Sequence, residues 1–172
     1  MATSAIRLAA AGDTVEFARI VAAYHADMIR VAFVVTGGDQ DLADDAVQAA
    51  LAVAWKKLGS LRDPDRLKPW LVSVAANEAR QLCRSRRRVA LVELDLDMPE
   101  PTSHDPADRA GVLDLERAIG HLSAADRELL ALRYEAGLDS SEIGALARHP
   151  AATIRWRLAR LIDRLRKELS DA

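Results

Sequence analysis

The sequence predicts an all-α protein made of two small helical domains joined by an acidic flexible linker. Apolar residues recur at spacings of three and four through most of the chain, as in amphipathic helices, and no convincing strand pattern occurs. One run rich in proline and acidic residues interrupts these helical segments. A chain of 172 residues with 50% hydrophobic and 29% charged side chains suits one ordinary domain or two small ones.

The first expected domain covers residues 14–88 and follows a flexible N-terminus at residues 1–13. The glycines of "TGGD" end its first helix, and a loop bounded by Gly59 and Pro69 separates the second helix from the third. Pro69 can occupy the first helical turn, where no backbone donor is needed. The periodicity places the three helices at residues 14–36, 40–58 and 66–88.

Residues 89–112 form the predicted linker. They hold six acidic side chains against one basic residue, Arg109, together with three prolines and almost no periodicity. Such a composition favours an extended and mobile chain. A domain boundary is therefore expected here.

The second expected domain covers residues 113–172. Ser123 followed by Asp126 matches a capping box, and Asp139 followed by Glu142 marks the start of the next helix. A short capped helix, a tight turn and a longer basic helix together predict a helix-turn-helix. The second helix of that motif lies in the major groove of DNA.

The last helix contains "HPAATIRWRLARLIDRLRK", in which an apolar stripe lies opposite an arginine-rich face. Trp156 lies almost opposite the centre of the stripe, so it needs a partner outside its own core. A solvated amphipathic helix is one interpretation, since arginine favours helices. The preceding helix and turn favour DNA, where arginine can fork onto guanine or hold phosphate. Trp156 can then pack on a thymine methyl, a sugar or a protein partner.

Two further segments carry concentrated charge. "RQLCRSRRR" at residues 80–88 has five arginines and no acid, more than a helix end needs to balance its dipole, and this favours phosphate contact. "DQDLADDAVQ" at residues 39–48 can simply stabilise a helix start. However, Asp41, Asp45 and Gln48 share one flank, which suits a basic protein partner.

Other classes of protein are disfavoured. The four histidines are scattered without metal-ligand spacing, and Cys83 is a lone thiol without an evident base. We expect neither catalysis nor a cofactor nor a metal. The opening residues lack the apolar core of a signal peptide, and no run is long enough to span a membrane. The expected location is the cytoplasm.

Two blocks resemble a known family. The first, "DLADDAVQAALAVAWKKLGSLRDPDRLKPWLVSVAANEARQLCRSRRR", resembles region 2 of bacterial sigma factors of the sigma-70 family, extracytoplasmic-function (ECF) group. The second, "LSAADRELLALRYEAGLDSSEIGALARHPAATIRWRLARLIDRLRKEL", resembles their region 4. The likeness covers residues 14–170, with the linker matching in place and character rather than in letters.

The resemblance implies a promoter-specificity subunit of RNA polymerase. Region 2 of the family binds the polymerase clamp helices and melts and reads the −10 element. Region 4 reads the −35 element and packs on the polymerase flap, and an anti-sigma factor commonly holds members of the group. The implied polymerase contacts are Asp41, Asp44, Asp45 and Gln48. The implied −10 contacts are Leu61, Asn77, Arg80, Arg84, Arg86 and Arg87. The implied −35 contacts are Arg148, Thr153, Arg155, Trp156, Arg157 and Arg160.

Five positions depart from the family pattern. Ala49 stands where glutamate is usual, Val53 where a basic residue is frequent, and Ala76 where arginine commonly precedes Asn77. Arg148 replaces a frequent glycine, and Trp156 replaces a small polar residue. These departures leave open the strength of the clamp contact and the promoter sequence.

Two other functions remain open from the sequence. A helix-turn-helix regulator could bind its operator without polymerase, although it would not need the acidic helix of residues 40–58. A degenerate sigma relative could bind polymerase or an inhibitor and read no DNA, which Ala49, Val53 and Trp156 keep open.

Overall fold

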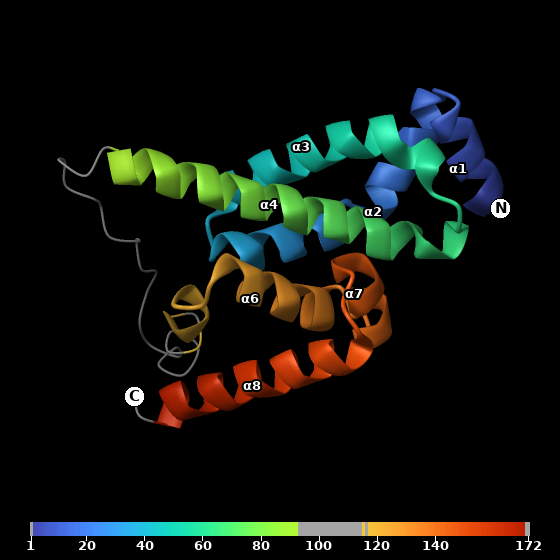
Figure 1. Ribbon diagram of the computed structural model, residues 1–172. Helices are drawn as coiled ribbons and strands as arrows, with labels where there is room; N and C mark the ends of the chain where they lie inside the picture. The colour runs from blue at the N-terminus through green and yellow to red at the C-terminus, as the bar shows by residue number, and fades with distance from the viewer. Residues whose placement is uncertain (1, 93–114, 116, 171–172) are drawn as a thin grey trace, which may run out of the picture.

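The computed structural model describes residues 2–92, 115 and 117–170, and the regular structure within these ranges is helical (Figure 1). This confirms the all-α class. The elements are α1 (Ala2–Ala10), α2 (Thr14–Thr36), α3 (Gln40–Lys57), the 3-10 turns η1 (Leu58–Ser60) and η2 (Pro64–Arg66), α4 (Leu67–Val92), α6 (Ala124–Leu130), the π-helical turn η3 (Ala131–Glu135), α7 (Ser140–Ala147) and α8 (Ala151–Ser170). Residues 115 and 117–120 are also helical.

Helices α2, α3 and α4 pack on one another and form the core of the N-terminal unit, residues 2–92. Helix α3 contributes small side chains to this contact, which lets its neighbours approach closely; Ala43, Ala46, Ala50 and Ala54 are fully buried. Met28 of α2 and Leu71 of α4 fill the space between the helices. Most apolar positions of the predicted periodicities lie on the buried faces, but Val15 of α2 and Trp55 of α3 are exposed.

The turn between α2 and α3 explains the two glycines of "TGGD". Gly37 ends α2 in the left-handed conformation, with φ of 82°, which a residue without a Cβ adopts at little cost. The Gly38 N–H donates to the carbonyl of Phe33 at 2.9 Å, and Asp39 then caps α3 by accepting the N–H of Leu42. The chain therefore reverses within a few residues.

The expectation of a flexible N-terminus at residues 1–13 was wrong for residues 2–10, which form α1. Ile6 and Ala9 of α1 are buried, and the helix packs on α2, α3 and the η1 turn. A nine-residue helix is marginal by itself. Its stability comes from these tertiary contacts, which cannot be predicted from the local sequence.

The predicted linker overlaps the end of α4, which continues to Val92 rather than ending at residue 88. Residues 89–92 are therefore helical. The remainder of the linker, from residue 93 to residue 112, lies outside the described residues, so its predicted mobility stays a prediction.

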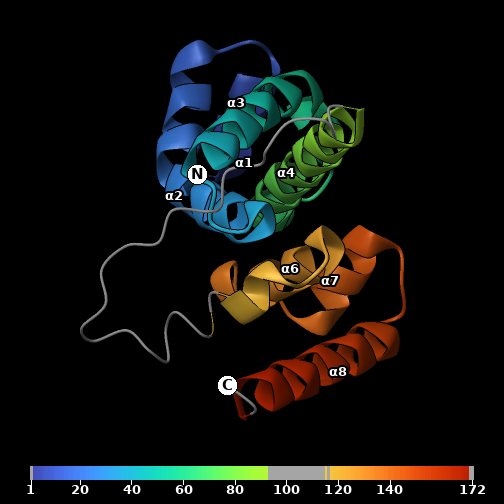
Figure 2. The same ribbon diagram turned by 90° about the vertical axis from the view of Figure 1, so that its left-hand side faces the viewer.

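The C-terminal unit, residues 115 and 117–170, stacks beneath α2 and α4. Helices α6 and α7 lie between these helices and α8, which forms the outermost layer (Figures 1 and 2). Helix α6 and the η3 turn contact α2, and α6 and α7 contact α4. The two units therefore share a packed interface in addition to the covalent connection. The exact boundaries of the two predicted domains stay a prediction.

Candidate polymerase and DNA interfaces

The acidic side chains expected to bind polymerase lie on the solvent side of α3. Asp41, Asp44, Asp45 and Gln48 are all exposed, while Ala43, Ala46 and Val47 on the opposite side are buried. Gln40 donates a hydrogen bond from its Nε2 to Oδ1 of Asp44 at 3.1 Å. The flank is thus a continuous polar and negatively charged surface that a basic partner could cover.

The departures at Ala49 and Val53 are half-buried, and Ala52 is exposed. The apolar side chains beside the acidic flank are therefore only partly open to solvent. Val53 points toward the cleft between the two units, whose lining it joins. Ala76 is fully buried, so the arginine common in the family could not be accommodated at this position without repacking.

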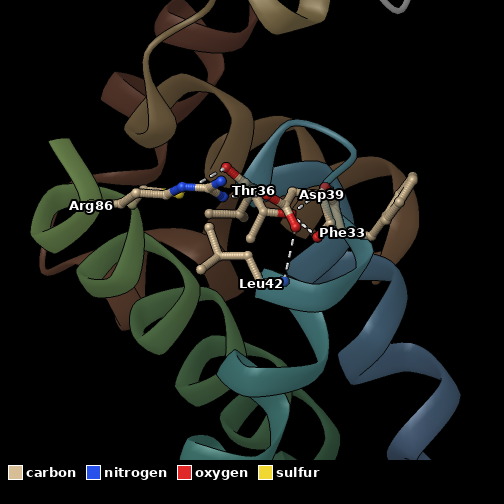
Figure 3. A network of polar contacts seen from close by, with 7 residues as sticks. Phe33, Thr36, Asp39, Leu42 and Arg86 are labelled. Atoms are coloured by element: carbon tan, nitrogen blue, oxygen red, sulfur yellow. Dashed lines mark hydrogen bonds and ion pairs between the residues drawn. The ribbon is translucent and has the colours of Figure 1, made fainter. Parts of the chain in front are cut away.

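An ion pair joins the start of α3 to the basic end of α4. Asp39 accepts the backbone N–H of Leu42 through Oδ1 at 3.0 Å, and its Oδ2 binds the guanidinium of Arg86 (Figure 3). Thr36 donates its hydroxyl to the carbonyl of Asp39 at 3.0 Å. The Leu42 hydrogen bond holds the pKa of Asp39 below its ordinary value. Burial opposes it as the next largest effect, and the hydrogen bond and charge of Arg86 lower the pKa further.

Asn77 and Arg80, two expected −10 contacts, face the C-terminal unit. The Arg80 Nη1 lies 2.9 Å from Oε2 of Glu128 on α6, and its Nη2 donates to Oδ1 of Asn77 at 3.2 Å. Both residues line a cleft of about 770 Å³ between the units, to which His149 and Arg157 also contribute. They are therefore not freely presented to solvent.

Burial raises the pKa of Glu128 above its ordinary value, although Arg80, Arg84 and Arg157 all act to lower it. The cost of removing this carboxylate from water therefore exceeds the attraction of the three arginines. Such a pair contributes little net stability, because desolvation offsets the Coulombic gain.

The other expected −10 residues differ in accessibility. Arg84 and Arg87 are exposed near the end of α4, and Arg86 is exposed although it is paired with Asp39. Leu61 is half-buried beside the hydrophobic core at the end of η1. The six expected −10 residues thus lie on α4 and in the loop before it. Arg84, Arg86 and Arg87 are exposed to solvent, whereas Leu61, Asn77 and Arg80 are half-buried.

The predicted helix-turn-helix is present as α7, a tight turn and α8. Asp139 and Glu142 form the predicted capping box at the start of α7. The Ser123 cap is made only in part: its Oγ accepts the Asp126 N–H, but the Asp126 carboxylate accepts from the Ser123 hydroxyl rather than from its backbone.

Two residues determine the geometry of this turn. A Cβ on Gly144 would lie 2.5 Å from the backbone oxygen of His149, so the close approach of the two chain segments requires glycine. Arg148 adopts a φ of 57°, and its N–H bonds the carbonyl of Gly144. The glycine frequent in the family at this position would adopt the left-handed conformation without the steric cost of a Cβ.

The outward face of α8 carries four of the expected −35 residues. Thr153, Arg155, Trp156 and Arg160 are exposed, and the stripe behind them, including Ile154 and Leu158, is buried. Trp156 is 58% exposed, which confirms the predicted register of the helix. The Arg160 guanidinium lies over the Trp156 ring, 4.9 Å from its centroid, in a cation–π contact.

Arg157 does not belong to this open face. Its guanidinium lies 3.6 Å from the Asp126 carboxylate on α6, and it also lines the cleft between the units. Its expected role at −35 would require this ion pair to open. Arg148 is exposed at the turn before α8, beside the group of Thr153 and its neighbours.

Sequence reasoning missed three residues at these sites: Asp39 as the partner of Arg86, and Arg127 and Glu128 as contacts to the N-terminal unit. The Arg127 Nε donates to the carbonyl of Val35 at 2.9 Å, although the two residues are 92 positions apart. No local pattern distinguishes such a side chain from an ordinary solvated charge.

The described part of the chain holds no group of three or more His, Cys, Asp or Glu side chains that could bind a metal. Within the same ranges, no helix is both long and apolar enough to cross a lipid bilayer.

Comparison with known proteins identifies the family to which the chain belongs. Residues 20–89 match the family described as Sigma-70 region 2. The RNA polymerase sigma factor CarQ of Myxococcus xanthus is 32% identical over 135 residues, which are 76% of this chain and 76% of CarQ. The probable RNA polymerase sigma factor RfaY of Xanthomonas campestris is 32% identical over 94% of this chain, which spans 42% of the length of RfaY.

A solved structure extends the likeness to the whole fold. The sigma factor RpoE of Bartonella quintana, crystallised with the anti-sigma factor NepR, is 26% identical. The two folds agree with a TM-score of 0.73 over 90% of this chain and 97% of RpoE. The chain therefore belongs to the ECF group of RNA polymerase sigma factors, the non-catalytic subunits that direct the polymerase to promoters.

Proposed function

We propose that this protein binds core RNA polymerase through the acidic flank of α3 and opens and reads promoters through two DNA surfaces. Residues 14–88 would serve as region 2 and residues 113–172 as region 4. The single observation that carries the proposal is the pairing of an exposed acidic flank with a helix-turn-helix in one chain. A regulator acting without polymerase has no use for the first surface.

The acidic flank suits the clamp of the polymerase. Asp44, Asp45 and Gln48 present acceptors on an exposed helical face, and Asp41 extends it toward the start of α3. Complementary charge steers such partners together and excludes wrong ones.

The basic surfaces suit the promoter. Arg84 and Arg87 are exposed for phosphate contact beside the −10 element, and Asn77 and Arg80 join them once the C-terminal unit moves away. Thr153, Arg155, Trp156 and Arg160 would read the −35 element from the major groove.

The polymerase flap would support the C-terminal unit, and the acidic linker would follow the RNA path. The protein would act in the cytoplasm, where its polymerase works. RpoE of Bartonella quintana was solved with an anti-sigma factor, and this supports a comparable inhibitor as a third partner of this chain.

Transcription in vitro with purified core polymerase on a library of genomic promoters tests the proposal. The protein should direct initiation from a small set of promoters that share a −35 and a −10 sequence. Binding to core without initiation would instead favour a degenerate protein-interaction module. Specific DNA binding with no effect of core would favour an independent regulator.

A further inference from the structure

We propose that Trp156 is the positioning residue for Arg160, and that the two side chains together read a G·C pair and a neighbouring A·T pair of the −35 element. Arg160 binds O6 and N7 of the guanine, and the Trp156 ring covers the methyl group of the thymine. The inference rests on the proposed function, because it concerns the −35 surface assigned there. It adds the base pairs that this surface recognises and a reason for an aromatic residue among the arginines.

The two side chains contact each other on the exposed face of α8. They are four residues apart, the spacing that brings side chains together along a helix. The Arg160 Cζ lies 4.9 Å from the centroid of the Trp156 ring, within the range of a cation–π contact. Ile154 and Leu158 are buried on the other side of the helix, whereas Trp156 is exposed. The ring therefore supports the arginine rather than the core of its own unit.

The contact restricts the Arg160 side chain without neutralising it. An aromatic ring attracts a cation but offers no carboxylate to its donors. Among the described residues, no carboxylate forms an ion pair with Arg160, whereas Arg157 pairs with Asp126 on the same helix face. The N–H donors of a guanidinium form a rigid planar fork. Arg160 is thus held in place with its fork available for two parallel hydrogen bonds.

Guanine is the base that suits this arrangement best. Its O6 and N7 lie side by side in the major groove and match the fork of an arginine. Trp156 lies in the second turn of α8, near the end of a recognition helix that faces base edges. A ring beside the guanidinium meets the neighbouring base pair, where the thymine methyl is the apolar group of the major groove. The two side chains therefore specify guanine next to an A·T pair.

Arg164 and Lys167 supply a different kind of contact. Both are exposed, and they line a hollow of about 540 Å³ on the outer side of α8 together with Trp156 and Arg160. They lie further from the start of the helix, which suits them to the phosphates beside the groove. Such contacts hold the protein on DNA and carry no direct sequence information. The two pairs of residues should therefore respond differently to changes in the bases.

Base analogues test the inference in the complex of the full chain with core polymerase and promoter DNA. In a promoter identified by transcription, each −35 guanine is replaced in turn by 7-deazaguanine, which lacks the N7 acceptor. Each −35 thymine is likewise replaced by uracil, which lacks the methyl group. Competition binding measures the affinity that each replacement costs.

Three variants and one control are compared. Arg160→Ala removes the fork, Trp156→Leu keeps an apolar side chain without an aromatic face, and Trp156→Phe keeps a ring. Arg164→Ala is the control, because it removes a positive charge from the same exposed face. Circular dichroism verifies that each variant folds, which the exposure of the three side chains favours.

The unsubstituted complex should lose at least about fivefold in affinity at one guanine and about two- to fourfold at the thymine of a neighbouring pair. Arg160→Ala should abolish the guanine penalty. Trp156→Leu should reduce the same penalty at least about twofold, although this side chain does not touch the guanine, and Trp156→Phe should retain most of it. Arg164→Ala should weaken binding to every DNA alike.

An unchanged guanine penalty in Trp156→Leu would overturn the inference, because Arg160 would then read the base without support from the ring. A penalty that persists in Arg160→Ala would overturn it as well. The inference fails alone if the unsubstituted complex selects a −35 sequence but responds to neither analogue. If the unsubstituted protein directs core polymerase to no promoter, the proposed function fails and the inference fails with it.

Discussion

Arg86 of α4 and Asp39 at the start of α3 form an ion pair, and the same Asp39 carboxylate accepts the Leu42 N–H that begins α3 (Figure 3). One side chain therefore caps the helix that carries the proposed polymerase surface and holds an arginine of the proposed DNA surface. A change at Asp39 should affect both.

Substitutions at Asp39 should separate these two roles. Asp39→Ala removes the cap and the ion pair and should lower the free energy of unfolding by about 1 kcal/mol. Asp39→Asn keeps a good helix cap and loses the charge, so its cost should be below about 1 kcal/mol, as for exposed ion pairs. Urea unfolding of both variants at neutral pH measures the difference. Equal losses would show that the cap contributes nothing by itself.

The contribution of the Asp39 charge should depend on pH. The pKa of Asp39 is lowered in the folded protein, so its stabilisation is fully present above its ordinary value of 3.8 and disappears as the pH falls through the folded value. The stability difference between the unsubstituted protein and Asp39→Asn should therefore be constant near neutrality and shrink below pH 3.8. Urea unfolding across this range measures it. A difference that grows on acidification would contradict the assigned direction.

Gly144→Ala should destabilise the helix-turn-helix. Glycine inside a helix normally costs about 0.5–1 kcal/mol relative to alanine, so alanine would otherwise be favourable. Here the new Cβ would meet the His149 oxygen at 2.5 Å, and overpacking of this kind costs about 1–3 kcal/mol. Gly120→Ala is the control, because its Cβ would meet nothing within 4 Å. Thermal unfolding should show that Gly144→Ala lowers the stability of the protein and that Gly120→Ala raises it. A stabilised Gly144→Ala protein would contradict the close approach of this position to the His149 oxygen.

Trp156→Ala should change DNA recognition with little change in stability. The Trp156 side chain is 58% exposed and contacts Arg160, so the free energy of unfolding should fall by only about 0.5 kcal/mol. Leu158→Ala, which removes a buried side chain of the same helix, should cost about 2–5 kcal/mol. Selection of −35 sequences by the holoenzyme should differ between Trp156→Ala and the unsubstituted protein. Identical selected sequences would remove Trp156 from the reading surface.

Asp45→Arg should weaken binding to core polymerase and leave the fold intact. The side chain is exposed, so stability should change little, but the new charge would face a basic partner surface. We expect about a tenfold or larger loss of affinity in a titration with fluorescently labelled core, with Asp163→Arg as the charge-matched control. Affinity equal to that of the control would exclude Asp45 from the interface.

The features that the sequence predicts well are local ones. The periodicity locates α2, α3 and α8, and short-range capping signals such as Asp139 with Glu142 locate α7. The exposure of Trp156 also follows from the local register of α8. Each of these depends on residues within a few helical turns, so the pattern contains the necessary information.

The features that the sequence does not predict depend on distant partners. Helix α1 is stabilised by burying Ile6 and Ala9 against other helices, and nothing within residues 1–13 specifies that surface. Glu128 resembles any acidic residue of an amphipathic helix until α6 is placed beside Arg80. The position of Arg157 in the last helix predicts that it lies on the DNA face, but its guanidinium instead pairs with the Asp126 carboxylate of α6.

The dependence of promoter binding on core polymerase tests the central claim most directly. Band shifts and permanganate footprints on a promoter identified by transcription, with and without core at fixed salt, measure binding and melting together. The account predicts weak, mostly non-specific binding by the free protein, because neither DNA surface is extensive and Arg80 is engaged by Glu128. With core, binding should be tight and the −10 thymines reactive, since joining two weak sites raises affinity by about 10²–10⁴. Tight and sequence-specific binding by the protein alone, with no further melting when core is added, would contradict it.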